Sequence, residues 1–292
     1  MSKIYIVATP IGNLSDISQR ALETLRNVDL IAAEDTRRTL KLLNYFEIKK
    51  PVISNYKHNE EGRGKELIDR IIQEGIDIAV VSDAGTPCIS DPGSHLVDLA
   101  LKNNIEVTAI PGPSSVTAAL SVSGFNFISF SFMSFIPREN KERRKYFESI
   151  LKSDIDTVVI FESPNRIIKS LNELQSILPE CELFVINDIT KFHEKFLKGK
   201  ISEVIDKLEI DEKSGLGEYT IVVHKIPTED AVKEDDLSDS ERTGQISAEA
   251  LLVDEMVKNN CTLKEAIEIV NTKTKINKKE IYKASLSLKS KF

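Results

Sequence analysis

The sequence has few cysteines, and none of them stands in a disulfide or metal-binding pattern. Cys88, Cys181 and Cys261 lie far apart, form no CxxC pair and leave an odd residue over, so neither a disulfide framework nor a zinc site is predicted. The four histidines show no metal spacing such as HExxH, and we expect each to pack or to form hydrogen bonds locally. We therefore expect no metal centre, and a reducing cytoplasm as the location.

Long apolar runs and an excess of positive charge are also absent. No stretch approaches the roughly 18 apolar residues that span a membrane, and the N-terminal segment KIYIVATPIGN turns too early for a secretion signal. The net charge is −7 and 29% of the residues are charged, which excludes a chain that coats nucleic acid through bulk electrostatics. We expect a soluble protein without a membrane partner, in which any RNA contact comes from local basic patches.

The first 124 residues alternate short β-branched runs with helical periodicity. This alternation is typical of βαβ units around a largely parallel sheet, and it predicts a first α/β domain over residues 1–124. The expected strands are 4–8, 30–33, 52–54, 78–82 and 107–110, and the expected helices are 17–28, 36–46, 65–74 and 96–102.

A second α/β domain is predicted over residues 125–226. It begins with an alternating strand that Pro137 ends. The expected strands are 127–135, 157–161, 183–186 and 219–223, and the expected helices are 141–151 and 166–178.

The composition then changes sharply. Residues 227–244 hold seven acids against one Lys and one Arg, which predicts a solvated acidic linker over 227–246. Residues 247–292 predict an appendage of three short helices. A capping box of Thr262 and Glu265 opens the second helix, and Asn277 is the expected N-cap of the third.

Four unusual turns follow the strands of the first predicted sheet. In open α/β sheets, ligands bind outside the carboxyl ends of the strands. Gly and Pro could merely shape any single turn, but four at one sheet edge predict a ligand site. They are ATPIGN (8–13), AAEDTRR (32–38), SDAGTPCISDPG (82–93) and IPGPSS (110–115).

The third of these turns is stiff and acidic. It contains two Gly, two Pro and two Asp, and neither GxGxxG nor GxxxxGK[ST] is present in the chain. Asp83 and Asp91, with no Lys beside them, argue against a phosphate ligand. A ligand with an amino group, ribose hydroxyls and a positive centre suits the turn better, because Asp83 can accept hydrogen bonds and Gly85 lets the backbone approach closely. S-adenosylmethionine has these three features.

Several long motifs resemble the tetrapyrrole-methylase superfamily, and within it the branch that acts on ribosomal RNA. They are VATPIGNLSDISQRALETLRNVDLIAAEDTRRTLKLL, SDAGTPCISDPG, PGPSS, FESPNRI and DITKFHEKFLKG, in this order over residues 3–224. The resemblance implies two α/β domains with S-adenosylmethionine in the cleft between them, and a homodimer. It also implies 2'-O-methylation of a cytidine ribose in the decoding region of 16S rRNA, within the 30S subunit.

The resemblance also implies which residues contact the cofactor. Four positions of the second predicted domain depart from the family pattern: Ser134 replaces a Gly, Asn165 a His, and Asn187-Asp188 an Arg-Glu pair. The implied cofactor residues are Pro10, Ser82, Asp83, Ala84, Thr86, Pro87, Ser114, Ser115, Phe161 and Glu162.

Methyl transfer to a hydroxyl needs a group that takes the proton. Glu34 and Asp35, which leave a strand into a helix, are the first candidates, and plain N-capping of that helix is the alternative. Lys191 and Glu194 are the second candidates, because we expect them to share one face of a helix; the alternative is a solvated ion pair.

Local basic residues are the candidates for RNA contacts, although charge runs are usually solvated faces. The C-terminal stretch 273–291, with seven Lys and one Glu, is a further patch. The individual candidates are Arg37, Arg38, Arg138, Arg143, Arg144 and Arg166.

Three other functions remain open at this point. A methylase of a corrin-type or other small molecule would keep the cofactor and change the acceptor. A ribosome-assembly factor could use the fold only for binding. An unrelated nucleotide-binding enzyme is disfavoured by the acids in the 82–93 turn.

Overall fold

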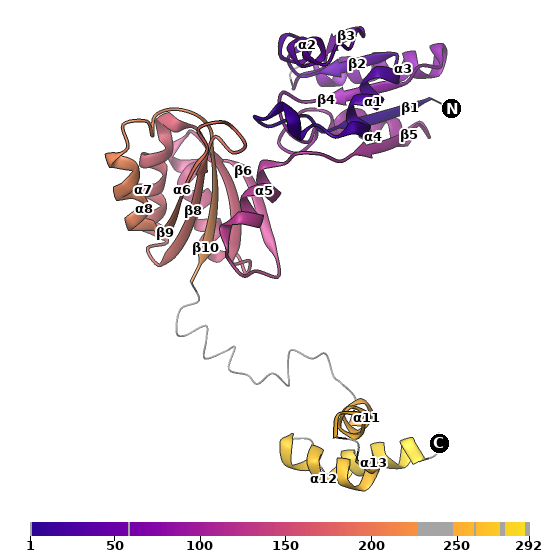
Figure 1. Ribbon diagram of the computed structural model, residues 1–292, viewed down its shortest axis with the longest axis vertical. Coiled ribbons are helices and arrows are strands. Elements are labelled where there is room, and N and C mark those ends of the chain that lie inside the picture. Colours follow the sequence, from indigo (N-terminus) through magenta and orange to yellow (C-terminus); the bar gives the residue numbers. More distant parts are fainter. Residues whose placement is uncertain (1, 58, 227–247, 260, 275–277, 290–292) are drawn as a thin grey trace. The chain divides into compact units, whose positions relative to one another are not determined.

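The computed structural model describes residues 2–57, 59–226, 248–259, 261–274 and 278–289. The chain forms two compact units, residues 1–226 and residues 227–292 (Figure 1). The predicted linker, 227–246, and the predicted N-cap Asn277 lie outside the described residues. None of the helices in the described part of the chain combines the length and apolarity that a bilayer span needs.

The first unit begins with a five-stranded sheet in the order β3-β2-β4-β1-β5, in which all neighbouring strands are parallel. Every residue of β2 and β4 is buried, as expected for parallel strands that are covered on both faces. The largely parallel sheet predicted from the sequence is confirmed. Its strands are β1 (Lys3–Val7), β2 (Leu30–Ala33), β3 (Val52–Ser54), β4 (Ile78–Val81) and β5 (Glu106–Ile110).

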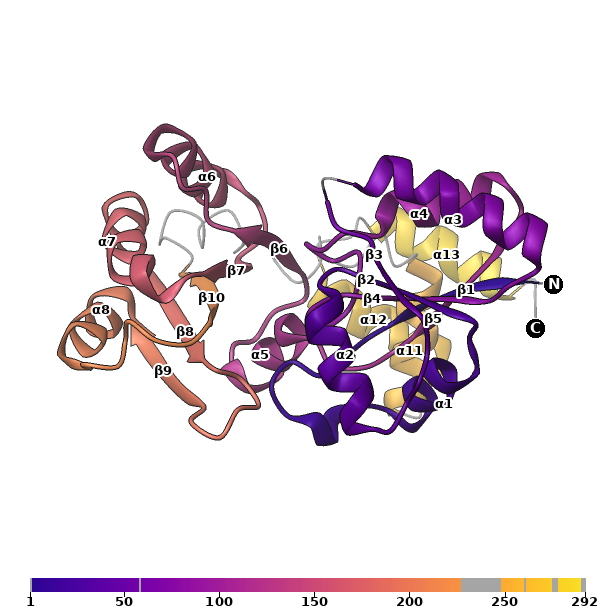
Figure 2. The same cartoon turned by 90° about the horizontal axis from the view of Figure 1, so that it is seen from above.

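Helices cover both faces of this sheet. Strand side chains alternate between the faces, so that Leu30 packs with α3 and α4 while Ile31 packs with α1 and α2. Figure 2 shows the two helix pairs on opposite sides of the strands. The helices are α1 (Gln19–Asn27), α2 (Thr36–Tyr45), α3 (Glu60–Glu74) and α4 (Ser94–Lys102), and a short 3-10 turn (Leu14–Asp16) precedes α1.

A second five-stranded sheet follows, in the order β6-β7-β10-β8-β9. Strands β6 and β7 are parallel, and the other neighbours are antiparallel. The predicted strand 127–135 starts only at Phe130, and β9 was not predicted. The strands are β6 (Phe130–Phe135), β7 (Thr157–Glu162), β8 (Cys181–Asn187), β9 (Lys195–Lys200) and β10 (Tyr219–Lys225).

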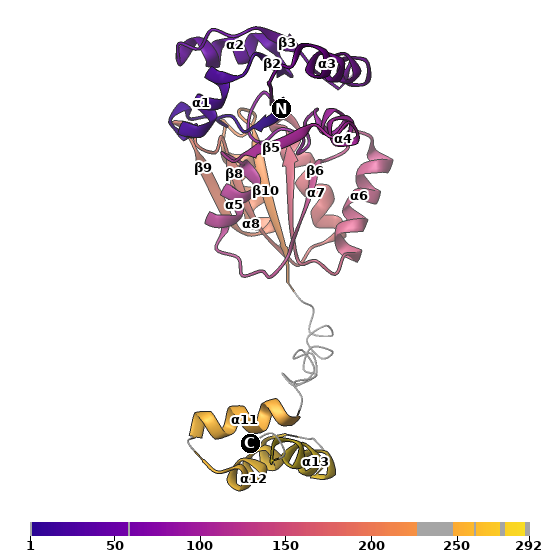
Figure 3. The ribbon, with the colours of Figure 1, turned by 90° about the vertical axis from the view of Figure 1, so that its right-hand side faces the viewer.

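Three helices pack on one face of the second sheet, and α5 packs on the other (Figure 3). Phe147, Leu171 and Val204 anchor the three, whereas Leu120 of α5 packs against Phe184. The sequence did not predict α5 or α8. The helices are α5 (Ser115–Ser123), α6 (Asn140–Lys152), α7 (Ile167–Ile177) and α8 (Ile201–Ile210), with a 3-10 turn (Pro164–Arg166) before α7.

The second unit holds helices α11 (Ala248–Asn259), α12 (Leu263–Lys273) and α13 (Lys278–Lys289), which pack around Leu252, Val270 and Ile281. The predicted capping box is confirmed, because the Thr262 side chain accepts from the Glu265 N–H and the Glu265 carboxylate accepts from the Thr262 N–H.

Candidate functional site

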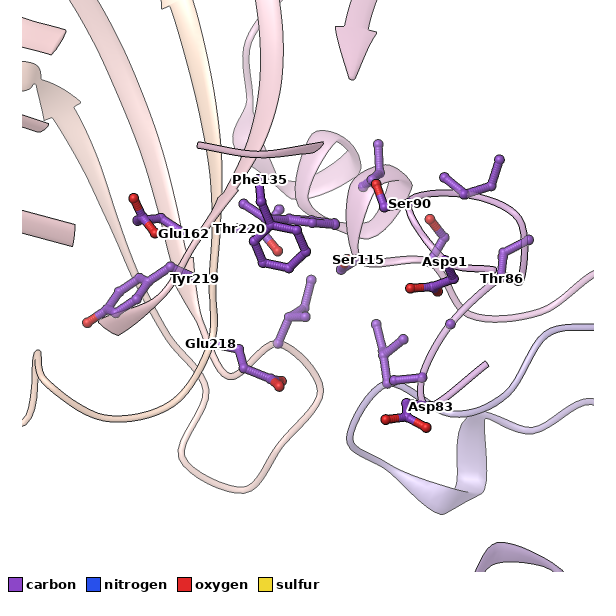
Figure 4. A pocket seen from close by; sticks show the side chains of 18 of the residues that line it. Asp83, Thr86, Ser90, Asp91, Ser115, Phe135, Glu162, Glu218, Tyr219 and Thr220 are labelled. Carbon is purple, nitrogen blue, oxygen red and sulfur yellow. The ribbon is translucent and has the colours of Figure 1, made fainter. Parts of the chain in front are cut away.

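A cleft of about 550 Å³ lies between the turns that leave the first sheet and the second sheet (Figure 4). On the second sheet it is lined by the C-terminal end of β7 and the N-terminal end of β10. Its volume lies in the range of small-molecule sites. Asp83, Thr86 and Asp91 line one side, and Phe135 and Thr220 line the other. All four predicted turns contribute residues to the lining, the 8–13 turn through Ile11.

The 82–93 turn is held by the backbone of the first turn of the chain. Thr9 donates its N–H to the Gly85 carbonyl at 2.9 Å, and Gly85 donates back to the Thr9 carbonyl at 3.0 Å. Gly85 has a φ of 80°, which a residue with a Cβ adopts at a cost, and an added Cβ would lie 3.3 Å from Ile11 Cγ2. Cys88 and Ser90 also have left-handed conformations, with φ of 68° and 69°. Two non-glycine residues of this turn therefore have strained backbones, as do Asp188 and Thr190 between β8 and β9.

The cleft is lined by five acidic residues, of which Glu34, Asp83 and Asp91 lie in the turns that leave the first sheet, while Glu162 and Glu218 lie at the second sheet. The Asp83 N–H donates to Glu34 Oε2 at 3.3 Å, and Asp83 Oδ1 accepts from the Asp35 N–H at 3.0 Å. Burial raises the pKa of Glu34, and burial together with the neighbouring Glu34 raises the pKa of Asp91 to about 6. Arg38 Nη1 lies 3.4 Å from Asp83 Oδ2.

This electrostatic arrangement favours a cationic ligand over a phosphate. In the described part of the chain, no group of three His, Cys, Asp or Glu side chains is arranged to hold a metal ion. Ionised carboxylates can accept hydrogen bonds and contribute negative potential to the cleft.

The structure brings most of the implied cofactor residues together. Pro10 and Ser82 line a smaller neighbouring pocket, and Pro87 lines neither pocket. The residues that line the main cleft are Asp83, Ala84, Thr86, Ser114, Ser115, Phe161 and Glu162.

Glu162 has a buried carboxylate that is occupied by protein donors. It accepts hydrogen bonds from the Ser163 N–H, from Ser170 Oγ and from the guanidinium of Arg166. Arg166 also donates to the Ile136 carbonyl at 2.8 Å. Figure 4 shows the Glu162 carboxylate turned away from Asp83 and Asp91. These contacts hold the cleft wall in place, and the Arg166 guanidinium is occupied by Glu162 and the Ile136 carbonyl.

The side chains of Glu34 and Asp35, the first candidates for the proton acceptor, lie in different environments. Glu34 lines the cleft, but Asp35 does not. Asp35 is the N-cap of α2, where its side chain accepts from the Arg37 N–H at 2.8 Å and pairs with the Arg37 guanidinium. Arg37 lowers the pKa of Asp35 to about 2. The capping alternative therefore describes Asp35, whereas Glu34 remains a candidate base.

The prediction that Lys191 and Glu194 share a helix face is wrong. Residues 188–194 form a turn between the antiparallel strands β8 and β9. Lys191 Nζ lies 2.6 Å from Asp188 Oδ1, and Glu194 accepts from the Thr190 N–H at 2.5 Å. Neither side chain lines the cleft.

Two of the departures from the family pattern have left-handed backbones. Ser134 has a φ of 61°, and Asp188 has a φ of 53°. A left-handed conformation explains why a Gly suits the position of Ser134. Asn187 donates to the Leu216 carbonyl at 3.0 Å, and Asn165 lies in the 3-10 turn before α7.

The predicted RNA contacts divide by exposure. Arg37, Arg38, Arg138 and Arg144 are exposed. Arg143 is only 3% exposed and donates to Glu173, to the Arg138 carbonyl and to Asn140. Its guanidinium is part of the fold and is not offered to a ligand. Sequence reasoning did not separate it from its exposed neighbour Arg144.

Comparison with known proteins gives the family. Residues 3–205 match the family model of tetrapyrrole (corrin/porphyrin) methylases. The chain is 48% identical to ribosomal RNA small subunit methyltransferase I of Thermotoga maritima, over 76% of this chain and 98% of that protein. It is 39% identical to the Synechocystis protein of the same name, over 99% of both chains.

Solved structures show the same fold. Diphthine synthase aligns with a TM-score of 0.59 at 17% identity, over 82% of this chain and 96% of that one. Uroporphyrin-III C-methyltransferase of Thermus thermophilus, complexed with S-adenosyl homocysteine, aligns with a TM-score of 0.53 at 14% identity, over 76% and 97%. This chain therefore belongs to the tetrapyrrole methylase family, and within it to the ribosomal RNA small subunit methyltransferase I proteins.

Proposed function

We propose that this protein transfers a methyl group from S-adenosylmethionine to the 2'-hydroxyl of a cytidine in 16S rRNA, within the 30S subunit. The acidic cleft at the carboxyl ends of the first sheet carries the proposal, because it suits a cationic donor in a chain of this family. The relatives' names supply the class of acceptor.

The cleft residues fit the donor chemically. Asp83 can accept hydrogen bonds from ribose hydroxyls or an amino group, and Thr86 and Ser115 offer hydroxyls. The rings of Phe135 and Phe161, whose centroids lie 5.2 Å apart, provide an apolar surface for an aromatic base. When bound, S-adenosylmethionine supplies an electrophilic methyl group on a positively charged sulfur.

The protein's own task is to position the acceptor and to receive its proton. Aligning donor and acceptor supplies much of the acceleration in such a displacement. Glu34 is our proposed proton acceptor and Asp91 is the second candidate, because both line the cleft and burial raises the pKa of both. Asp35, Lys191 and Glu194 lie outside the cleft lining and take no part in this step.

A second copy of the chain is the proposed partner at the α5 face of the second sheet. Phe127 and Phe184 belong to the core on that face, and their ring partners Phe130 and Phe196 are 42% and 62% exposed. An apolar surface that continues from the core to solvent favours a protein contact.

The test uses 30S subunits from cells that lack the gene, with isotope-labelled donor. We expect label at one ribose of the small-subunit rRNA, and at least a hundredfold slower transfer for Glu34→Gln with unchanged affinity for S-adenosylhomocysteine. Label on a precorrin but not on the rRNA would refute the proposed acceptor. The absence of donor binding would refute the proposed enzyme.

A further inference from the structure

A second groove adjoins the cleft. Pro10 and Ser82, two of the implied cofactor residues, line it, but donor binding does not explain its wall of α2 residues. The groove has a volume of about 330 Å³ and lies between the first turn of the chain and α2. Its α2 residues, Arg38, Lys41, Leu42 and Tyr45, recur at three- and four-residue spacing, so one face of the helix forms a wall.

The groove has a closed floor and an open rim. Thr9, Thr39 and Ser82 are buried at 2%, 5% and 3% exposure. At the rim, Tyr45 is 65% exposed and Leu14 is 37% exposed. The Tyr45 and Phe46 rings form a T-shaped pair at a centroid distance of 4.9 Å. An exposed aromatic ring beside an apolar side chain is a suitable surface for stacking a base.

The groove has an excess of positive charge, with Arg38 and Lys41 against Asp83, whereas acidic residues predominate in the cleft. Arg38 and Lys41 line the groove, and Lys41 forms no ion pair with any of the described residues. Arg38 and Asp83 line both pockets, and their ion pair at 3.4 Å marks the border between the cationic groove and the acidic cleft. A phosphate thus finds complementary charge in the groove and repulsion in the cleft.

We propose that this groove holds a nucleotide of the acceptor RNA beside the methyl donor. This proposal rests on the proposed function. The Tyr45 ring stacks on the base, and Lys41 and Arg38 contact a backbone phosphate. The ribose lies toward the border formed by Arg38 and Asp83, which places a hydroxyl on the side of the cleft. The ligand class is an unpaired ribonucleotide, because a base in a duplex cannot stack on a side chain.

The test compares Tyr45→Ala, Tyr45→Phe and Lys41→Gln with Lys49→Gln, which removes another exposed lysine, in the loop between α2 and β3, that lies outside both pockets. Three measurements are made on each full-length variant. They are calorimetry with S-adenosylhomocysteine, fluorescence anisotropy with a labelled single-stranded oligoribonucleotide, and the KM and kcat of methyl transfer to 30S subunits.

We expect Tyr45→Ala to weaken oligoribonucleotide binding about tenfold. Tyr45→Phe should bind like the unmodified protein, because stacking needs the ring and not the hydroxyl. Lys41→Gln should reduce the salt dependence of binding by about 0.7 in the log-log slope. Tyr45→Ala and Lys41→Gln should each raise KM more than they lower kcat. Their affinity for S-adenosylhomocysteine should be unchanged, and this unchanged affinity also shows that the cleft is folded. Lys49→Gln should match the unmodified protein.

The two proposals fail in different ways. If the unmodified protein methylates 30S subunits while Tyr45→Ala and Lys41→Gln behave like Lys49→Gln, the nucleotide groove is refuted and the function stands. If the unmodified protein binds the oligoribonucleotide through Tyr45 and Lys41 but transfers no methyl group to rRNA, the function is refuted and the groove stands. Loss of affinity for a carboxylated macrocycle, and not for RNA, would assign the groove to a small-molecule acceptor.

Discussion

The hydroxyl oxygens of Ser90 and Ser134 lie 2.8 Å apart, and both residues have left-handed backbones. Ser90 belongs to the turn after β4, and Ser134 lies where the register of β6 against β7 shifts between Phe132 and Phe135. This contact connects the 82–93 turn, which follows the first sheet's strand β4, with the irregular strand β6 of the second sheet.

Ser134→Gly and Ser134→Ala should therefore have different effects. Both remove the hydroxyl contact, but only Gly relieves the left-handed backbone, which costs other residues about 1 kcal/mol. We expect Ser134→Ala to lower the free energy of unfolding by about 1 kcal/mol, and Ser134→Gly to leave it nearly unchanged, in urea titrations. Equal losses for both variants would show that the backbone conformation carries no strain.

Asp91 should make stability depend on pH. Its pKa is about 6 in the folded protein against an ordinary value of 3.8, first because of burial and then because of Glu34. Between these values the folded state holds the proton and the unfolded state does not, so the free energy of unfolding falls as pH rises from about 4 to 6.

Asp91→Asn removes this dependence. The unfolding free energy of the variant minus that of the unmodified protein should grow as pH rises from about 4 to 6, and should level off above. Asp69→Asn, an exposed carboxyl on α3, controls for the loss of one charge. A difference for Asp91→Asn that does not change with pH would contradict the prediction.

Gly12 is the point where the first turn of the chain meets the 188–194 turn. A Cβ on Gly12 would lie 2.6 Å from Lys191 Cγ, 2.8 Å from Thr190 Oγ1 and 3.1 Å from the Ile189 carbonyl oxygen. Gly12→Ala should therefore cost about 1–3 kcal/mol of unfolding free energy, measured by urea titration.

Gly62→Ala is the matched control for this substitution. Gly62 lies in α3 with open space around its Cα, so an added methyl group should stabilise the helix by up to about 1 kcal/mol. A Gly12→Ala variant as stable as the unmodified protein would show that the Lys191 side chain simply moves aside.

Arg166 should act on stability rather than directly on RNA. Arg166→Ala leaves the buried Glu162 carboxylate without its cationic partner, which typically costs about 3–5 kcal/mol. We expect a large fall of the urea midpoint, and the double variant Glu162→Gln with Arg166→Met should recover part of it. If Arg166→Ala weakened RNA binding at unchanged stability, the RNA contact expected from the sequence would be supported instead.

The first sheet and the donor turns could be predicted because their signals are local. Apolar runs such as Ile78–Val81 indicate buried parallel strands, and the Gly, Pro and Asp residues that follow indicate a turn with a ligand. Because βαβ connections make the strands parallel, the turns after several strands could be expected at one edge of the sheet, although the order of the strands was not predicted.

Other features depend on contacts that a single sequence does not reveal. Strand β9, KFLKGK, lies at the sheet edge and carries little apolar signal, so pairing with β8 alone defines it. Its absence from the prediction left TKFHEK to be interpreted as a helix. Helix α8 differs, because its apolar residues Ile201, Val204, Ile205 and Leu208 recur at helical spacing and make it detectable from the sequence.

The candidate site was predicted to the level of its turns but not to the level of each side chain. Glu34 and Asp35 are adjacent and chemically alike, and only the fold decides that one enters the cleft and the other caps α2. The role of Asp91 depends on its burial, and the groove along α2 depends on how the first turn of the chain approaches Tyr45. Neither property is encoded in a local pattern.

The paired hydrogen bonds between Thr9 and Gly85 have a consequence for selectivity among donors. Because the two turns are joined by their main chains, the wall beside a bound ligand cannot widen by side-chain rotation. Analogues of S-adenosylmethionine with a bulkier alkyl group on sulfur should then lose affinity through steric conflict. Analogues altered at a solvent-facing position should bind at rates set by diffusion, without a slow opening step.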